Sequence, residues 1–208
     1  IRRPPKATLF PSTTRFRSVV AVVYMGYNAF STHFAIYAIK HLRMTPSSIS
    51  GPLLVRVFSV LIFAIPSAIL STKIGRKMTI RIGLVILSAT VFMIYFLTPE
   101  TAKLLSPIFI VYGIGFAMVS VQLGPMVVEL CSNADVGRYM GYYYLATTVA
   151  QIITPAFAGI FLDKFGQQTI ALYTAVFMAI GFVVTFFIKH GDSKTLNIKA
   201  SAVLAGND

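Results

Sequence analysis

The stretch STKIGRKM, residues 71–78, is a short turn with three basic residues between two long apolar runs. Each flanking run has about 20 residues, the length that a helix needs to cross the ~30 Å hydrocarbon core of a membrane. Lys and Arg residues accumulate in the cytoplasmic loops of membrane proteins. The stretch therefore predicts two membrane-spanning helices and the side of the membrane on which they are joined.

Apolar runs of this kind make up most of the chain, which is 56% hydrophobic and 12% charged and has a mean hydropathy of +0.78. These averages lie outside the usual range of soluble domains. In lipid the backbone must satisfy its own hydrogen bonds, and continuous runs without two-residue alternation favour helices over a barrel. We predict an all-α membrane protein with six transmembrane helices, at approximately Val19 to His41, Ile49 to Leu70, Met78 to Leu97, Leu104 to Cys131, Tyr139 to Leu162 and Thr169 to Ile188.

The net charge of +12 is better explained by membrane orientation than by nucleic-acid binding, because no soluble module is left to bind a nucleic acid. Most basic residues lie in one set of alternate turns and in the two tails. The opposite turns hold Lys40, Arg43, Lys103 and Lys164. The positive-inside rule then predicts a multi-pass protein of the cell membrane with both termini in the cytoplasm.

Residues 1–17 differ from the rest of the chain, because they are polar, contain prolines and begin with Ile1 rather than Met. They lack the apolar core and cleavage site of a signal peptide. Two interpretations stay open, a non-native segment that resembles translated sequencing adapter and a natural cytoplasmic linker. The predicted organisation is this segment, a six-helix membrane unit over 18–190 and a cytoplasmic tail over 191–208, and we expect the chain to be a fragment.

The turn at 71–78 resembles the cytoplasmic loop signature of the major facilitator superfamily. In that pattern a Gly is followed after three residues by Asp and after two more by Gly, Arg and a basic residue. Gly75, Arg76 and Lys77 match the pattern, whereas Ala68 and Thr72 depart from it. The turn also lies between the second and third predicted spans, where the family keeps its signature.

A second stretch, from Gly159 through Asp163 to Gly166, repeats the glycine and aspartate spacing, although Gln167 replaces the arginine. Gly75 and Gly166 are 91 positions apart, close to one unit of three helices. Three helices reverse the side of the membrane, so the pair is what inverted three-plus-three repeats would leave. Chance similarity stays open as the alternative, because Gly and Asp are common in turns.

The resemblance covers residues 18–190 and implies the carboxy-terminal six-helix half of a twelve-helix secondary transporter. The stretches PMVVE (125–129), GYYY (141–144) and AQIITP (150–155) resemble bacterial members related to sugar/cation symporters. The resemblance thus implies alternating-access transport of a small organic solute, with a sugar or glycoside favoured and a proton or sodium ion as the coupling ion. The implied partners are the missing amino-terminal half and the lipid bilayer.

Polar residues inside the spans are costly in lipid, so each is expected to have a partner or to face water. They are concentrated in the first, second, fourth and fifth spans, which predicts four cavity-lining helices and two peripheral ones. Helical spacing gathers some of them into polar and aromatic stripes that suit a hydroxylated solute. The candidate cavity residues are Tyr24, Tyr27, Asn28, Arg56, Gln122, Tyr144, Thr148 and Gln151. Hydrogen bonding between helices without a ligand is the alternative.

Charged and titratable groups add three further hypotheses. Arg56 binds an anionic substrate, pairs with a titrating carboxylate, or reaches the outer interface as a snorkelling side chain. His33 is the candidate titrating group, with a hydrogen-bonded packing role as the alternative. The resemblance implies a cytoplasmic gate formed by Gly75, Arg76, Lys77 and Glu129.

An enzyme is not predicted, because the sequence has no paired intramembrane carboxylates, no metal-spaced His/Cys group and no phosphate loop. Neither a cofactor nor a metal is predicted for the same reason. The alternative function is a channel-like or non-transporting six-helix bundle acting as a homodimer, since the sequence does not demonstrate alternating access.

Overall fold

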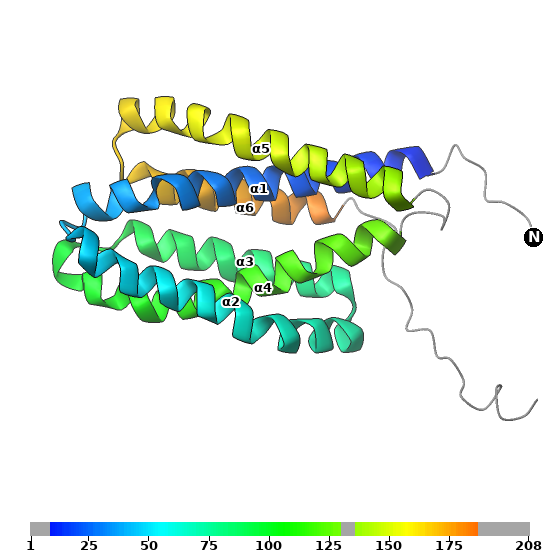
Figure 1. Cartoon of the computed structure of the whole chain (residues 1–208), viewed down its shortest axis with the longest axis horizontal. Coiled ribbons are helices and arrows are strands. Elements are labelled where there is room, and N and C mark those ends of the chain that lie inside the picture. The colour runs from blue at the N-terminus through cyan, green and yellow to red at the C-terminus, as the bar shows by residue number, and fades with distance from the viewer. Residues whose placement is uncertain (1–8, 130–135, 187–208) are drawn as a thin grey trace, which may run out of the picture.

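A computed structural model of the chain describes residues 9–129 and 136–186, and within these ranges the chain forms six α helices and one short 3-10 helix (Figure 1). The elements are α1 (Leu9–Lys40), α2 (Pro46–Ile74), α3 (Arg76–Tyr95), η2 (Pro99–Leu104), α4 (Leu105–Glu129), α5 (Val136–Phe165) and α6 (Thr169–Thr185). The described ranges contain no strand. The prediction of an all-α membrane protein is confirmed.

Four helical stretches in the described ranges are long and apolar enough to cross a membrane, at Pro46–Ile74, Arg76–Tyr95, Pro99–Met126 and Val136–Phe165. Helix α6 is apolar but has 17 residues, slightly fewer than a typical span. Helix α1 has 32 residues and is the least apolar of the six described α helices. Its sequence includes Arg15 and Arg17 near its start, and Asn28 and His33 within its apolar run. The chain is therefore a multi-pass membrane protein whose first helix carries the most polar groups.

Helices α2 and α5 extend at both ends beyond the apolar runs that predicted them, and α1 and α3 begin earlier than predicted. Helix α2 ends at Ile74 and α3 begins at Arg76, so the turn predicted over 71–78 is reduced to Gly75. Helix α1 begins at Leu9 and includes part of the segment 1–17, whose origin stays a prediction. The predicted tail at 191–208 lies outside the described residues.

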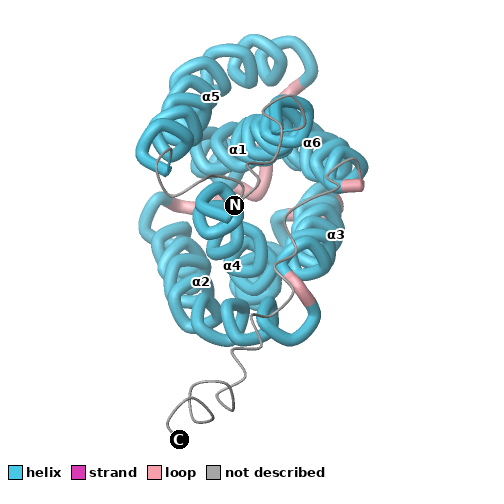
Figure 2. The backbone as a smooth tube through the Cα atoms, turned by 90° about the vertical axis from the view of Figure 1, so that its right-hand side faces the viewer, coloured by secondary structure: helices cyan, strands magenta, loops and turns pink. Residues whose placement is uncertain are grey.

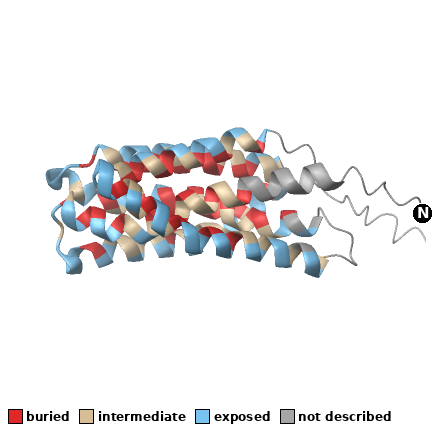
Figure 3. Cartoon of the chain, turned by 90° about the horizontal axis from the view of Figure 1, so that it is seen from above, coloured by how far each residue is buried: buried red, intermediate tan, exposed pale blue. Residues whose placement is uncertain are grey.

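The six helices pack in a single order. Helix α2 packs on α4, α4 on α3, α3 on α6, α6 on α1 and α1 on α5. Seen down the helices in Figure 2, α1 and α4 occupy the middle, α3 and α6 lie on one side, and α2 and α5 lie on the other. Buried residues gather on the helix faces that point into the bundle, and exposed residues lie on its outside (Figure 3).

This packing order contains a repeat. The order is α2, α4, α3, α6, α1, α5. If α1 is exchanged with α4, α2 with α5 and α3 with α6, the same order results, read from its other end. Helices α1 and α4 run in opposite directions (Figure 1), so the second unit of three helices is inverted relative to the first. The packing therefore has the inverted three-plus-three arrangement that the spacing of the two glycine turns predicted.

The two turns are also alike in backbone geometry. Gly75 and Gly166 have φ angles of 88° and 89°, which L side chains rarely adopt. The N–H of Gly75 donates to the Ser71 carbonyl at 3.0 Å, and that of Gly166 donates to the Leu162 carbonyl at 2.9 Å. Each bond closes the last turn of the preceding helix, so the two stretches are equivalent in structure as well as in spacing.

The two ends of the bundle differ in charge. At the end where α2 meets α3, the described side chains include five basic residues and no acidic one: Lys73, Arg76, Lys77, Arg81 and Arg138. At the opposite end, Lys40, Arg43, Lys103 and Lys164 are partly offset by Glu100 and Asp163. The more basic end is the one that the sequence predicts to be cytoplasmic.

Candidate functional site

A cavity of about 190 Å³ lies between α1, α2 and α4. Its lining residues are Tyr27, Arg56, Val57, Val60, Leu61, Tyr112 and Phe116. The structure thus brings together two of the predicted cavity residues, Tyr27 and Arg56. The volume is below the ~300–1,000 Å³ of pockets for drug-sized ligands, and it suits a small solute or one part of a larger site.

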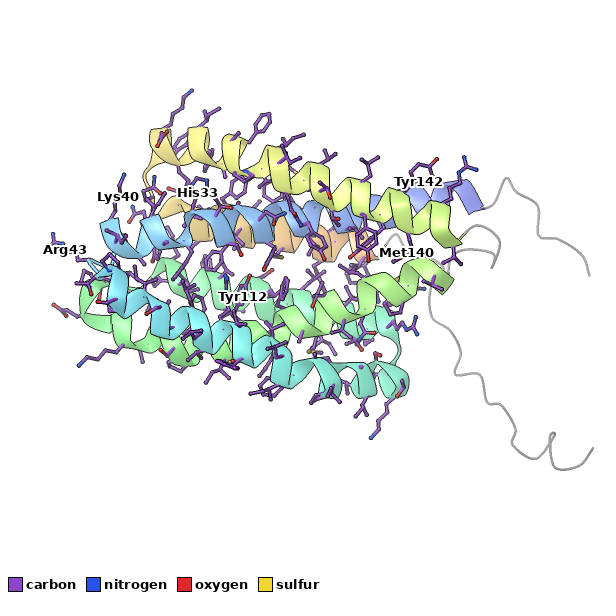
Figure 4. The ribbon with its side chains drawn as sticks, in the orientation of Figure 1. His33, Lys40, Arg43, Tyr112, Met140 and Tyr142 are labelled. Atoms are coloured by element: carbon purple, nitrogen blue, oxygen red, sulfur yellow. The ribbon has the colours of Figure 1, made fainter. Side chains whose placement is uncertain are left out.

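Aromatic rings form one wall of this cavity. The rings of Tyr27 and Phe116 stack with their centroids 4.3 Å apart and their planes 18° from parallel. Tyr112 lies next to Phe116, with its ring centroid 6.2 Å away and nearly parallel at 8°. Tyr112 points into the interior of the bundle (Figure 4), and its buried hydroxyl has no hydrogen-bond partner in the described part of the chain. The wall therefore consists of stacked apolar rings and one buried hydroxyl that has no hydrogen-bond partner among the described residues.

The guanidinium of Arg56 is directed inward across the cavity. Its Nη1 donates to the hydroxyl of Ser31 on α1 at 3.4 Å, and its central carbon lies 5.9 Å from the ring centroid of Phe109 on α4. No carboxylate among the described side chains forms an ion pair with it. A snorkelling arginine would extend toward the outer interface instead.

The polar face of α1 continues from the cavity toward the more basic end. Tyr24, Tyr27 and Asn28 lie on the same side of α1 as Ser31, as their helical spacing predicts. The Tyr24 hydroxyl lies 3.3 Å from that of Tyr143 on α5. Asn28 is 9% exposed, and its amide nitrogen finds no hydrogen-bond partner in the described ranges. This face of α1 therefore has a buried hydrogen-bond donor, the amide of Asn28, that no other described residue accepts.

The predicted residues of α5 do not line this cavity. Tyr144 is 60% exposed, and Thr148 and Gln151 are also exposed. They share a flank of α5 beside the face that packs on α1. Tyr143, whose hydroxyl contacts that of Tyr24, was not among the predicted cavity residues. The run of three tyrosines at 142–144 could have indicated it.

Gln122 and His33 each donate a hydrogen bond to a backbone carbonyl of the neighbouring helix. Gln122 is buried, and its Nε2 donates to the Ser67 carbonyl of α2 at 3.3 Å. His33 Nε2 lies 3.1 Å from the Pro155 carbonyl of α5, and it carries a proton there because a carbonyl only accepts (Figure 4). The two bonds join pairs that are equivalent in the repeat, and each acceptor is at or next to a helix proline, Pro66 or Pro155. This is the helix-to-helix role that the sequence left open for such residues; a role at the solute or in proton coupling stays a prediction.

The predicted gate lies at the basic end. Gly75 forms the turn, and Arg76 and Lys77 begin α3. Thr72, which stands where the family pattern has Asp, donates its hydroxyl to the Ile69 carbonyl of its own helix at 2.7 Å. The side chain of Glu129 lies outside the described side chains, so its pairing with Arg76 stays a prediction.

Arg81 contacts the end of α6, which the sequence did not predict. Its Nη2 donates to the Thr185 carbonyl at 3.4 Å, and its guanidinium carbon lies 4.3 Å from the ring centroid of Phe186. The carboxy-terminal end of a helix carries partial negative charge, so a cation is favourable there. Arg81 therefore joins α3 to the end of α6.

Comparison with known proteins identifies similar membrane transporters. A family model described as Major Facilitator Superfamily matches residues 18–204. An uncharacterized MFS-type transporter of Methanocaldococcus jannaschii is 29% identical to this chain over 127 residues. The alignment covers 61% of this chain and 31% of that relative, so the chain spans about a third of the length of the curated relative it matches.

Proposed function

Because the chain belongs to the Major Facilitator Superfamily, we propose that it forms one six-helix half of a twelve-helix transporter that moves a small organic solute by alternating access. The observation that carries this proposal is the inverted packing order of the six helices. In transporters built from such repeats, the solute site lies near the middle of the membrane, where the repeats meet. The cavity between α1, α2 and α4 is the candidate for part of that site.

The exposed helices support a second six-helix half as the partner. The most apolar stretch of α2 is 11% buried and that of α5 is 28% buried, compared with 44% for the stretches of α3 and α4. These two helices lie on the same side of the bundle (Figure 2). We propose that this side meets the amino-terminal half of the transporter, and that lipid covers the remaining apolar surface.

The charge of the two ends supports an orientation. The end with Lys73, Arg76 and Lys77 is proposed to face the cytoplasm of the cell, which places both termini there. The same turn is proposed to act as a gate with Glu129 when the cytoplasmic side is closed. The lost carboxylate at Thr72 makes this gate weaker than the family pattern, because threonine supplies a hydrogen bond without a charge.

The solute is proposed to be a hydroxylated compound such as a sugar or glycoside, moved together with a proton or sodium ion. Aromatic rings at Tyr27 and Phe116 can cover its apolar face, while hydroxyl and amide groups replace its hydrogen bonds to water. Asp and Glu are absent from the middle of all six apolar runs. A coupling carboxylate is therefore proposed to lie in the other half.

Uptake measurements in cells that express the full-length gene test this proposal. Wild-type protein is expected to give saturable uptake of a hydroxylated solute, and Asn28→Ala is expected to raise KM about 2- to 10-fold, the effect of one lost hydrogen bond. Gln151 does not line the cavity but lies on the exposed part of α5, the helix proposed to meet the other half. Gln151→Ala is expected to raise KM by a similar factor, because its amide is proposed to bind the solute between the two halves. Asn28→Ala should leave the thermal stability unchanged or higher, because the amide it removes has no partner in the described chain. Ser120→Ala is the control, since its hydroxyl donates to the Phe116 carbonyl of its own helix at 2.8 Å. An unchanged KM in both variants would remove Asn28 and Gln151 from the site.

A further inference from the structure

We propose that the transported solute carries an anionic group, a carboxylate in the simplest case, and that Arg56 binds this group in the cavity between α1, α2 and α4. The inference rests on the proposed function and narrows it from hydroxylated solutes in general to hydroxylated organic acids, such as sugar acids and hydroxylated aromatic acids.

Arg56 carries a positive charge that no described carboxylate neutralises. A guanidinium has five N–H donors, and a charge inside a membrane needs a partner or water. Here the described chain supplies one long hydrogen bond, to Ser31 at 3.4 Å, and the face of one ring, Phe109, at 5.9 Å. No carboxylate of the described ranges pairs with Arg56. An anion in the cavity would accept two parallel hydrogen bonds from the guanidinium, the geometry that Arg favours.

Arg56 lies well away from the ends of the helices. It lies ten residues after Pro46, the first residue of α2, which is about 15 Å of helix at 1.5 Å per residue. Ser31, its acceptor, lies nine residues before the end of α1 at Lys40. The half-buried guanidinium is therefore directed from α2 toward α1 and α4, into the space of the cavity.

Tyr112 places a buried polar group beside the same cavity. Tyr112 is fully buried and lines the cavity, and its hydroxyl has no partner in the described part of the chain. A buried hydroxyl without a partner costs folding free energy, whereas a bound carboxylate or hydroxyl would satisfy it. Arg56 and Tyr112 thus place one cation and one buried neutral donor beside the same cavity.

The cavity has a size that suits a small ring compound. Its volume of about 190 Å³ has room for one six-membered ring and its carboxylate. The rings of Tyr27 and Phe116, stacked on each other, form an apolar wall against which such a ring can pack. The geometry therefore matches a ring with an acidic substituent directed at Arg56.

The experiment compares matched acids and neutral compounds by calorimetric titration of the full-length protein in detergent. The pairs are glucuronate with glucose, and 4-hydroxybenzoate with 4-hydroxybenzyl alcohol, at one pH and one ionic strength. We expect at least one acid to bind 10-fold or more tightly than its neutral counterpart. If no acid in the panel exceeds its neutral counterpart, the inference is wrong.

Variants at Arg56 assign the effect to the cavity. Arg56→Gln is expected to weaken binding of the acid about 10- to 100-fold, the effect of losing a charge-assisted pair of hydrogen bonds, and to change binding of the neutral compound less than 2-fold. Arg56→Lys keeps the charge without the planar fork and should lie in between. Arg43→Gln is the matched control, because it removes an exposed arginine from the loop at the same end of the bundle (Figure 4). Equal losses for acid and neutral compound, or a loss of stability without any change in acid preference, would overturn the inference and indicate an ion pair of Arg56 with another part of the protein.

Tyr112→Phe provides a second test if the Arg56 variants do not fold. It is expected to leave the ligand-free protein as stable as wild type or more stable, and to weaken binding of the acid about 3- to 10-fold. Unchanged acid binding in this variant would contradict the role given to the Tyr112 hydroxyl. Saturable uptake of neutral compounds without preference for acids would end the inference and leave the proposed transport function standing, whereas the absence of binding and uptake for every compound would end both.

Discussion

Replacing Gly113 by alanine is expected to lower the free energy of unfolding by about 3 kcal/mol, the upper end of the cost of overpacking. Gly113 lies where α4 crosses α2, and a Cβ built on it would collide with the Cβ of Ser59. It would also lie 3.1 Å from two backbone atoms, the carbonyl carbon of Ser59 and the nitrogen of Val60. Backbone atoms cannot rotate away as a flexible side chain can, so α2 would have to move off α4.

Circular dichroism of the full-length protein in detergent, followed on heating, measures this effect. Gly141→Ala is the matched control, because nothing lies within 4 Å of a Cβ at Gly141. That substitution should leave the stability unchanged or raise it by up to ~1 kcal/mol, since alanine favours helix more than glycine does. Wild-type stability of Gly113→Ala would mean that α2 and α4 do not cross in the way described.

The two turns of the repeat give the second large effect. Gly75→Ala and Gly166→Ala are each expected to cost about 1–3 kcal/mol, because alanine must adopt the backbone conformation of glycine there. Gly75 has φ 88° and ψ 149°, and Gly166 has φ 89°. Since the two turns have the same role in the two units, the two losses should be similar in size.

Thermal unfolding of the two single variants and the double variant checks this prediction. The two sites lie at opposite ends of the bundle (Figure 1), so their effects should add in the double variant. A large loss for Gly75→Ala together with none for Gly166→Ala would show that the turns are not equivalent. The match between Gly159 to Gly166 and the first turn would then be the chance similarity that the sequence left open.

The sequence located all six helices but not their ends. The length of an apolar run is set by the thickness of the membrane, whereas a helix can continue past the membrane until its backbone changes conformation. Helices α2 and α3 are therefore separated by Gly75 alone, although eight residues were assigned to the turn. The two glycines at equal spacing were the more precise signal, because each occupies a backbone conformation that side chains rarely adopt.

Side-chain partners were harder to predict than helix faces. Periodicity placed Tyr27 and Asn28 on one face of α1, but it could not show that Arg56 would reach across to Ser31, because a long side chain can point in several directions. For Gln122, the sequence showed a polar group in an apolar helix and not the carbonyl of Ser67 that accepts its hydrogen bond. Both partners lie on other helices, and their identity depends on how those helices cross.

Solute counterflow in proteoliposomes tests the central claim, that the full-length protein carries solute by alternating access. Vesicles with the reconstituted protein are loaded with unlabelled solute and diluted into a trace of the same solute in labelled form. A carrier whose single site faces each side in turn returns loaded with labelled solute, so we predict a transient accumulation of label above the outside concentration. Entry of label that only equilibrates, with no dependence on the unlabelled solute inside, would contradict the account and favour a channel-like bundle.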